Sequence, residues 1–407
     1  MRRRLIDTLG ANRIVVALSF ARLVDALGNS ILFILIPLYV GTVTTVLPLP
    51  EPVLVGLLIS FFGLVSAALQ PFLGAWVDRV GKRKPFILVG LAMMGLATLA
   101  FVAANAYYQL FVIRVLQGFG VALTIPASLA LMAAASERST RGGSMGIYTT
   151  CRMIGIAAGP ILGGFIFDRW GFAPAFYVAA GLIALGMLLV QLWVDEVEDA
   201  PPPPTAGAIR IFDRELHNPG ILGTTFAVFV MAAAITMMAT LERQFNERLA
   251  QTALAFGIAF SALMVSRLAF QGPFGWLSDR VGRKPLVVAG LVLLAPATAL
   301  LGVAATTLQL TLYRVIQGVG SAAVAAPGYA LAADLSREGS EARQMGAVTT
   351  GFFLGLALGP LLAGILAVPF FELPFLVGGA MCLAGAWVVW RWVPETLEGE
   401  EATVAAD

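Results

Sequence analysis

The chain has 407 residues, of which 59% are hydrophobic and only 12% are charged; its mean hydropathy is +0.87 and its formal net charge is +2. These values exclude a soluble globule, which needs more charge to cover its surface, and indicate a protein that lies in a bilayer. Scattered bases exclude a nucleic-acid binder. A single histidine, two cysteines and no nucleophile beside a base leave neither a metal cluster nor the parts of an enzyme.

Twelve apolar runs follow one another along the sequence, each close to the roughly 20 residues that a spanning helix needs. Their continuous hydrophobicity excludes a membrane β-barrel, whose strands alternate in polarity. In chain order, the expected spans are 14–39, 53–76, 85–104, 107–135, 144–167, 172–194, 219–241, 253–277, 285–304, 307–333, 343–368 and 372–393.

The spans divide into two groups of six. Residues 195–218 between the groups are rich in proline and charge, which is typical of a linker. The sequence therefore predicts an all-α membrane protein with two pseudo-equivalent six-helix bundles, at 1–194 and 219–393. A cytoplasmic linker joins them, and a cytoplasmic tail follows at 394–407. Residues 209–216 of the linker carry the weak signature of a short interfacial helix.

Lysine and arginine gather in alternate loops, and such bases mark the cytoplasmic side of a membrane. The opposite loops, at 41–52, 105–106 and 305–307, carry no base. We therefore predict a multi-pass protein of the cell membrane with both termini and the linker in the cytoplasm. One loop is a mild exception, because it contains Arg243 and Arg248, each beside a glutamate.

The loop between spans two and three carries a glycine, an acid, an arginine, a glycine and further bases, and this order returns between spans eight and nine. A match of this length indicates that the chain consists of two copies of one unit. The residues of this loop motif are Gly74, Asp78, Arg79, Gly81 and Arg83, and in the second copy Gly275, Asp279, Arg280, Gly282 and Arg283. The acid is placed to accept hydrogen bonds from the start of a helix in the other half, which predicts a conformational latch. In a compatible alternative, the bases only fix the topology.

Two further patterns are repeated. Arg114, Gln117 and Gly118 of span four return as Arg314, Gln317 and Gly318 of span ten. Span five carries spaced small residues, and span eleven repeats them with one alanine in place of a glycine. Small residues allow membrane helices to pack closely, and a proline among them can kink the helix. In span five these residues are Gly146, Gly155, Gly159, Pro160, Gly163 and Gly164.

Through these three patterns the sequence resembles the major facilitator superfamily of secondary transporters over nearly its whole length. In that family the loop motif joins spans two and three, the arginine pattern marks span four, and the spaced glycines mark span five. The span-five pattern is associated with drug/proton antiporters. The resemblance therefore implies multidrug efflux driven by proton entry, and it links Arg114 to proton coupling.

Ionisable residues inside spans cost about 2.5–3.5 kcal/mol each near a helix centre and persist mainly where they face a cavity or a partner. Asp25 is the one carboxylate deep in a span. We predict that it carries the proton and that Arg114 tunes it, because a buried carboxylate beside a movable arginine can bind and release a proton. The alternative is a fixed ion pair between Asp25 and either Arg22 or Arg114.

An excess of arginine inside the spans predicts a positively charged cavity, which would favour an anionic, zwitterionic or neutral substrate. Helical spacing places Arg22, Asp25 and Asn29 on one stripe of span one, which we expect to face the central cavity. The same spacing pairs Tyr148 with Arg152, and Arg267 with Gln271. The predicted substrate site therefore consists of Arg22, Asn29, Tyr148, Arg152, Arg267 and Gln271.

The predicted function is secondary active transport by alternating access, as proton-coupled efflux of small amphiphilic or drug-like compounds from a site between the bundles. One alternative is a uniporter or proton symporter/exporter for a specific organic anion or sugar, which the arginines favour and the span-five glycines oppose. Another is a receptor or scaffold that has kept the fold. We expect a small-molecule substrate, the lipid bilayer and a proton as coupling ion, with no other cofactor, no metal and no nucleic acid, and a monomeric state.

Overall fold

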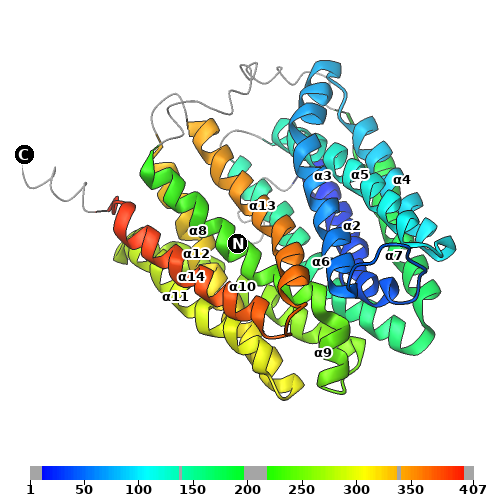
Figure 1. The fold of residues 1–407 in the computed structure, drawn as a ribbon. Coiled ribbons are helices and arrows are strands. Elements are labelled where there is room, and N and C mark those ends of the chain that lie inside the picture. Colours follow the sequence, from blue (N-terminus) through cyan, green and yellow to red (C-terminus); the bar gives the residue numbers. More distant parts are fainter. Residues whose placement is uncertain (1–11, 137–139, 197–217, 337–340, 398–407) are drawn as a thin grey trace, which may run out of the picture. The chain divides into compact units, whose positions relative to one another are not determined.

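The computed structural model describes residues 12–136, 140–196, 218–336 and 341–397, and in these ranges the regular elements are helices (Figure 1). The first half contains α2 (Arg13–Val40), α3 (Glu51–Val80), α4 (Lys84–Ala100), the 3₁₀ helix η1 (Phe101–Ala103), α5 (Tyr107–Ala135), α6 (Arg141–Trp170) and α7 (Phe172–Trp193). The second half contains α8 (Pro219–Thr236), η3 (Met237–Leu241), α9 (Glu242–Arg248), α10 (Ala253–Val281), α11 (Arg283–Ala299), η4 (Leu300–Val303), α12 (Thr307–Asp334), α13 (Glu341–Leu366) and α14 (Leu373–Trp392).

Twelve helical segments of the described chain are long and apolar enough to cross a membrane, which confirms the predicted all-helical class. The largest difference lies in span seven, expected to end at residue 241. It continues from α8 through η3 into α9 and reaches Arg248. The predicted interfacial helix at 209–216, most of the linker and residues 398–407 of the tail lie outside the described residues.

The two bases of α9 are paired with acids, which accounts for the exception to the charge rule. Arg243 Nη1 donates to Glu51 Oε2 at 3.0 Å, and its Nε donates to Glu247 Oε1 at 3.0 Å. Arg248 Nη1 donates to Glu372 Oε1 at 2.7 Å, and this hydrogen bond holds the pKa of the Glu372 carboxyl below its ordinary value. Each base therefore has an acid of its own at this end of the helices.

The second glycine of the loop motif ends a helix in both copies. Gly81 and Gly282 have φ values of 72° and 103°, in the region that favours glycine, directly after α3 and α10. Their N–H groups donate to Val77 O at 3.1 Å and to Ser278 O at 3.2 Å. The motif therefore needs a glycine here because the chain must turn sharply before the next span.

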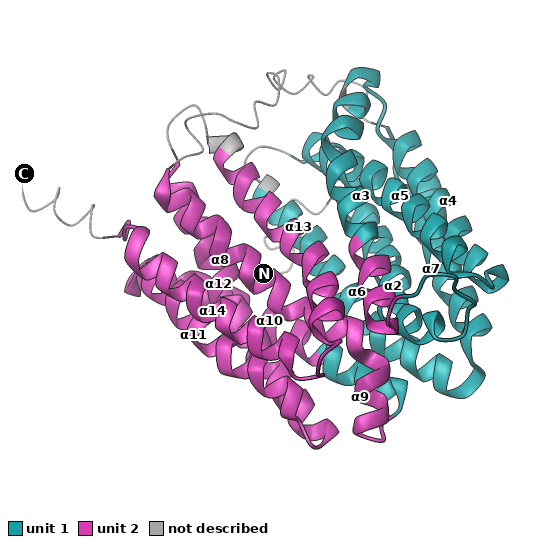
Figure 2. Ribbon diagram, in the orientation of Figure 1, with its two compact units in different colours: residues 1–48, 61–208, 252–261 teal, residues 49–60, 209–251, 262–407 magenta. Residues whose placement is uncertain are grey.

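The chain divides into two compact units (Figure 2). Unit 1 comprises residues 1–48, 61–208 and 252–261, and unit 2 comprises 49–60, 209–251 and 262–407. Two helices are shared: the first turns of α3 belong to unit 2 and the first turns of α10 belong to unit 1, whereas the rest of each helix belongs to the other unit.

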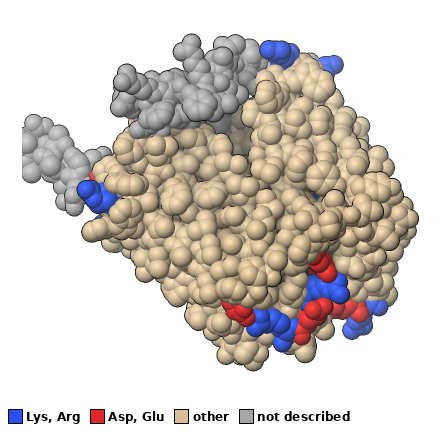
Figure 3. All heavy atoms as spheres, in the orientation of Figure 1, with Lys and Arg blue, Asp and Glu red and all other residues tan. Residues whose placement is uncertain are grey.

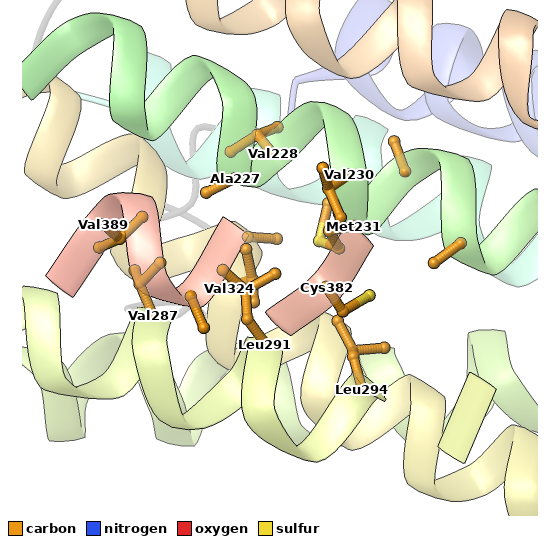
Figure 4. Close-up of a cluster of buried hydrophobic side chains, with 14 of the residues drawn as sticks. Ala227, Val228, Val230, Met231, Val287, Leu291, Leu294, Val324, Cys382 and Val389 are labelled. Carbon is orange, nitrogen blue, oxygen red and sulfur yellow. The ribbon is translucent and has the colours of Figure 1, made fainter. Parts of the chain in front are cut away.

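Each unit has its own buried apolar core. In unit 2, α8, α11, α12 and α14 direct aliphatic side chains toward one another, among them Val228, Met231, Leu291, Val324 and Val389 (Figure 4). The face drawn in Figure 3 carries its described charges near the ends of helices, with long uncharged stretches between them. This distribution is what a helix in hydrocarbon requires.

We predict that Gly81→Ala destabilises the protein by about 1–2 kcal/mol, because the left-handed backbone conformation is unfavourable for alanine. A Cβ at Gly81 would have nothing within 4 Å, so no steric clash contributes. Gly181→Ala, in the middle of α7, is the matched control, because it also has open space but an ordinary helical backbone. Thermal unfolding in detergent should show a lower Tm for the first variant and an unchanged or higher Tm for the second; equal shifts would contradict the conformational explanation.

Candidate functional site

Equivalent contacts fix the correspondence between the two copies of the repeat. A Cβ on Gly155 of α6 would meet the side chain of Ala26 in α2 at 2.9 Å, and one on Gly355 of α13 would meet that of Ala232 in α8 at 2.8 Å. Ala26 therefore corresponds to Ala232. By the same register, Arg22 corresponds to Val228 and Asp25 corresponds to Met231.

Asp25 and Arg22 form an ion pair on α2, in unit 1. Arg22 Nη1 donates to Asp25 Oδ2, and the aspartate is only 2% exposed. Asp25 Oδ1 and Arg22 Nε are buried without a hydrogen-bond partner in the described part of the chain. On α6, Tyr148 lies close enough to interact electrostatically with Arg22, and Arg152 with Asp25. Four predicted site residues are thus brought together inside one unit.

A small cavity adjoins the Asp25–Arg22 pair. Its volume is about 10 Å³, close to the least that can hold a water molecule. Tyr148 reaches it from α6, and Thr124 and Ser128 add hydroxyl groups from α5. Predicted Asn29 lies on α2 one turn beyond Asp25 but is not among the lining residues. The lining consists of Leu18, Ala21, Arg22, Asp25, Ile87, Leu91, Thr124, Ser128, Tyr148 and Val190.

The same place in unit 2 is a hydrophobic core. Val228 and Met231 stand where unit 1 has Arg22 and Asp25, and both belong to the apolar cluster of Figure 4. Val324 and Val348 of this cluster likewise correspond to Thr124 and Tyr148. Since one copy of the fold is stable with hydrocarbon in this position, the fold itself does not require the charges around Asp25. They are therefore the strongest candidate for a functional cluster.

The span-four arginine behaves differently, because both copies use it in the same way. Arg114 Nη1 donates to Gln117 Oε1 at 3.0 Å, and Gln117 Nε2 donates to Thr98 Oγ1 at 2.9 Å. In the other copy Arg314 Nη1 donates to Gln317 Oε1 at 2.8 Å, and Gln317 Nε2 donates to Thr298 Oγ1 at 2.9 Å. A buried arginine–glutamine–threonine chain thus links α5 to α4, and α12 to α11.

Within the described chain, Arg114 makes no hydrogen bond or ion pair with Asp25. Its guanidinium lies over the Phe62 ring, 4.9 Å from the centroid, and it forms no ion pair within the described ranges. Arg314 also donates to the Ile235 carbonyl at 2.9 Å. The repetition of the chain in both copies indicates a role in holding helices together, and the coupling role of Arg114 stays a prediction.

Most of the small residues in α6 lie where another chain segment leaves no room. A Cβ on Gly155, Gly159 or Gly163 would come within 3.0 Å of α2 atoms, and one on Gly164 would approach the Ala253 backbone at 2.5 Å. Gly146 is the exception, because a Cβ added there would meet nothing within 4 Å. Close helix packing therefore explains the span-five pattern from Gly155 onward. The helix continues through Pro160.

The loop motif is held within its own unit by the residues that the structure describes. Arg283 pairs with Asp334 and lies 3.6 Å from Asp279 Oδ1. A Cβ on Gly74 would meet Pro126 at 3.5 Å, and one on Gly275 would meet Ala326 at 3.9 Å, which are ordinary contacts. The latch between Asp78 or Asp279 and the other half of the chain stays a prediction.

Three carboxylates that cap helices were not predicted from the sequence. Glu196 accepts from the N–H groups of Arg83 and Lys84 at 2.8 Å each, and Glu395 accepts from Arg283 and Lys284 at 3.2 and 3.0 Å. Asp168, at the end of α6, accepts from Ala253 and Leu254 at 3.1 and 2.9 Å. Carboxylates favour helix starts because unpaired N–H groups gather there. Sequence spacing does not reveal these pairs, since each joins residues far apart in the chain.

Predicted residues Arg267 and Gln271 lie together on α10, in unit 2. The Arg267 guanidinium lies 5.7 Å from the centroid of the Phe352 ring, and Tyr329 is close enough for an electrostatic interaction. The predicted substrate residues thus belong to two units. Arg22, Tyr148 and Arg152 lie near Asp25 in unit 1, and Gln271 accompanies Arg267 in unit 2.

Comparisons with known proteins agree with this architecture. A family model described as Major Facilitator Superfamily matches residues 18–264 and again 220–406. The uncharacterised MFS-type transporter YuxJ of Bacillus subtilis is 28% identical over 337 residues, which cover 80% of this chain and 85% of that protein. The multi-drug resistance efflux pump PmrA of Streptococcus pneumoniae is 27% identical over 336 residues, covering 81% and 83%.

Solved structures show the same fold. A bacterial homologue of the human lysosomal transporter Spinster, in an inward-facing and occupied conformation, aligns with a TM-score of 0.78. The alignment covers 94% of this chain and 97% of that one, at 14% sequence identity. At this identity the likeness concerns the fold alone.

We predict that Gln117→Leu and Gln317→Leu each destabilise the protein by about 1–3 kcal/mol, because each removes buried hydrogen bonds on both sides of the glutamine. Gln191→Leu, on an exposed surface, is the control. Thermal unfolding in detergent should show similar losses for the two buried positions and little change for the control. An undiminished Tm in either buried variant would contradict the structural role of the chain.

Proposed function

The chain belongs to the major facilitator superfamily of secondary transporters, and we propose that it exports small amphiphilic, drug-like compounds in exchange for protons. A protein of this family is a multi-pass membrane transporter with a small-molecule substrate, and it is not an enzyme. The proposal adds the direction of transport, the coupling ion and the residues that carry them.

The observation that carries the proposal is the asymmetry around Asp25. Unit 1 keeps a buried aspartate, an arginine and a tyrosine beside a small cavity, with Arg152 near the aspartate, whereas unit 2 fills the corresponding place with valine and methionine. Buried charges in a spanning bundle are costly and mark ion or substrate pathways when the fold does not require them. A carboxylate with one unsatisfied oxygen is the one group of this cluster that can gain and lose a proton within the ordinary range of pH.

The proposed coupling step is an exchange of partners at Asp25. In the described state the carboxylate is paired with Arg22. A proton entering the cavity neutralises the carboxylate, so Arg22 no longer has its counter-charge and must find another partner. The affected side chains lie on α2 and α6, two helices in close contact through Gly155, Gly159 and Gly163. Protonation therefore acts on the packing of these two helices.

The direction of export rests on two supports. The closely packed glycines of α6 follow the pattern that the resemblance links to drug/proton antiporters, and one relative is named a multi-drug resistance efflux pump. The Asp25 cavity is lined by residues from the first halves of α2 and α6 and the last turn of α7, which are the halves predicted to face the cytoplasm. A proton released there enters the cytoplasm. We place the protein in the cell membrane, with both termini cytoplasmic, as a monomer.

A second candidate function is a uniporter or proton symporter/exporter for an organic anion or sugar. The observation that favours it is Arg267, which forms no ion pair within the described ranges. In this alternative, Arg267 would bind the anionic or polar substrate, and transport would not exchange the substrate for a proton. The uniporter is distinguished by substrate movement without compound-triggered proton flux, and the symporter by proton flux in the same direction as the substrate.

We predict that Asp25→Asn abolishes proton flux in proteoliposomes, because the amide cannot carry a proton in exchange for substrate. The measurement follows internal pH under an imposed proton gradient while a cationic, a neutral and an anionic test compound are added in turn. Asp195→Asn, an exposed position after α7, is the control and should behave as the unmodified protein.

Equilibrium exchange of a labelled compound should persist in Asp25→Asn, because substrate binding does not require the proton. Loss of both proton flux and exchange would point to misfolding or to a substrate role for Asp25. Proton flux that continues in Asp25→Asn would remove Asp25 from the coupling step. Exchange without proton flux in the unmodified protein would establish the uniporter alternative.

A further inference from the structure

Arg267 is a half-buried cation for which the described part of unit 2 provides no acid. Its neighbours there are the Phe352 ring, 5.7 Å from the guanidinium carbon, and the hydroxyl of Tyr329. Its Nε is buried and has no hydrogen-bond partner among the described residues. An arginine kept inside a membrane bundle without a counter-charge is costly, so its retention needs an explanation outside the packing of the fold.

Gln271 adds a second unmatched group on the same face of α10. It follows Arg267 by one helical turn, so the two side chains are neighbours. Gln271 Oε1 is buried and likewise lacks a partner among the described residues. Buried polar groups are almost always hydrogen-bonded, and two adjacent exceptions indicate a place where a ligand completes the bonding.

The first copy of the repeat shows that the fold does not need this arginine. The alignment of Gly74 with Gly275 in the loop motif places Ser66 where unit 2 has Arg267, and Gln70 where it has Gln271. In unit 1 these two side chains are hydrogen-bonded to each other, because Gln70 Nε2 donates to Ser66 Oγ at 3.3 Å. Unit 2 therefore carries a charged arginine and a glutamine oxygen without a described hydrogen-bond partner, whereas unit 1 carries two neutral side chains that are hydrogen-bonded to each other.

The surroundings of Arg267 are aromatic. Phe352 contacts Phe353 with ring centroids 5.7 Å apart, and the Tyr329 hydroxyl lies near both Thr349 and the arginine. A guanidinium holds a carboxylate through two parallel hydrogen bonds, and an aromatic ring offers a flat apolar surface to the body of the same ligand. The cluster is therefore matched to a molecule with a compact anionic group on an aromatic body.

We propose that Arg267, Gln271, Tyr329 and Phe352 form a binding subsite for the carboxylate end of an aromatic carboxylic acid. Arg267 binds the carboxylate, Phe352 contacts the aromatic body, and Gln271 contacts a polar group beside the carboxylate. The inference rests on the proposed transport function, since it names the substrate class. The subsite proposal differs from the transport proposal because it requires only that the ligand binds, without proton coupling.

The test is isothermal titration of the purified full chain in detergent with two pairs of probes of nearly equal shape. The pairs are 2-naphthoate with 2-naphthamide, and indole-3-acetate with indole-3-acetamide. In the unmodified protein each acid should bind about 10- to 100-fold more tightly than its amide, the range that a hydrogen bond to a charged group contributes. Equal affinities for acid and amide, or no binding of either acid, would overturn the proposal.

Substitutions then assign the effect to the cluster. Arg267→Gln should remove the preference for the acid while leaving amide affinity unchanged, and Arg267→Lys should retain part of it, because lysine keeps the charge without the bidentate geometry. Phe352→Leu should weaken acid and amide equally. Arg391→Gln, an exposed arginine near the end of α14, is the charge control and should change neither affinity. A preference that survives Arg267→Gln would place the anion site elsewhere.

These outcomes are separate from those of the transport experiment. Acid-selective binding that depends on Arg267, together with no compound-triggered proton flux, would support the subsite and reject antiport. Proton flux lost in Asp25→Asn, without acid-selective binding, would support antiport and reject the subsite.

Discussion

A polar group inside a membrane-spanning bundle must find its partner within the protein, because the surrounding hydrocarbon offers none. This constraint organises both copies of the repeat. The chains from Arg114 to Thr98 and from Arg314 to Thr298 satisfy it with the same residue types and nearly the same distances. Because both copies contain the same hydrogen-bonded chain, we assign this chain to the stability of the fold.

Differences between the copies separate function from architecture. Asp25 and Arg22 in unit 1 correspond to Met231 and Val228 in unit 2, and Arg267 in unit 2 corresponds to Ser66 in unit 1. The two copies can therefore be compared with each other. Where one copy lacks a charged residue that the other contains, the fold does not require that residue. The two units have diverged in opposite directions: unit 1 holds a cluster in which an acid is paired with an arginine, and unit 2 holds an arginine that forms no ion pair within its described residues.

The sequence predicts the spans and the repeat well, because both depend on local hydrophobicity and on residue identity at fixed spacing. It also predicts neighbours on one helix, such as Arg22 and Asp25. Contacts between helices are beyond it: nothing in the spacing indicates that Gln117 reaches Thr98, or that Asp168 meets the start of α10. For the same reason the stripe on span one groups Asn29 with Asp25, although the cavity is shaped by four other helices as well.

The caps formed by Glu196 and Glu395 have a practical consequence for handling the protein. Each follows the last helix of its copy and binds the start of α4 or α11, so the residues directly after α7 and α14 are structural parts of the bundles. A C-terminal truncation or an affinity tag replacing residues from 395 onward would open the start of α11. Fusion points are therefore best chosen beyond Leu397, where the described chain has completed its last contact with Glu395.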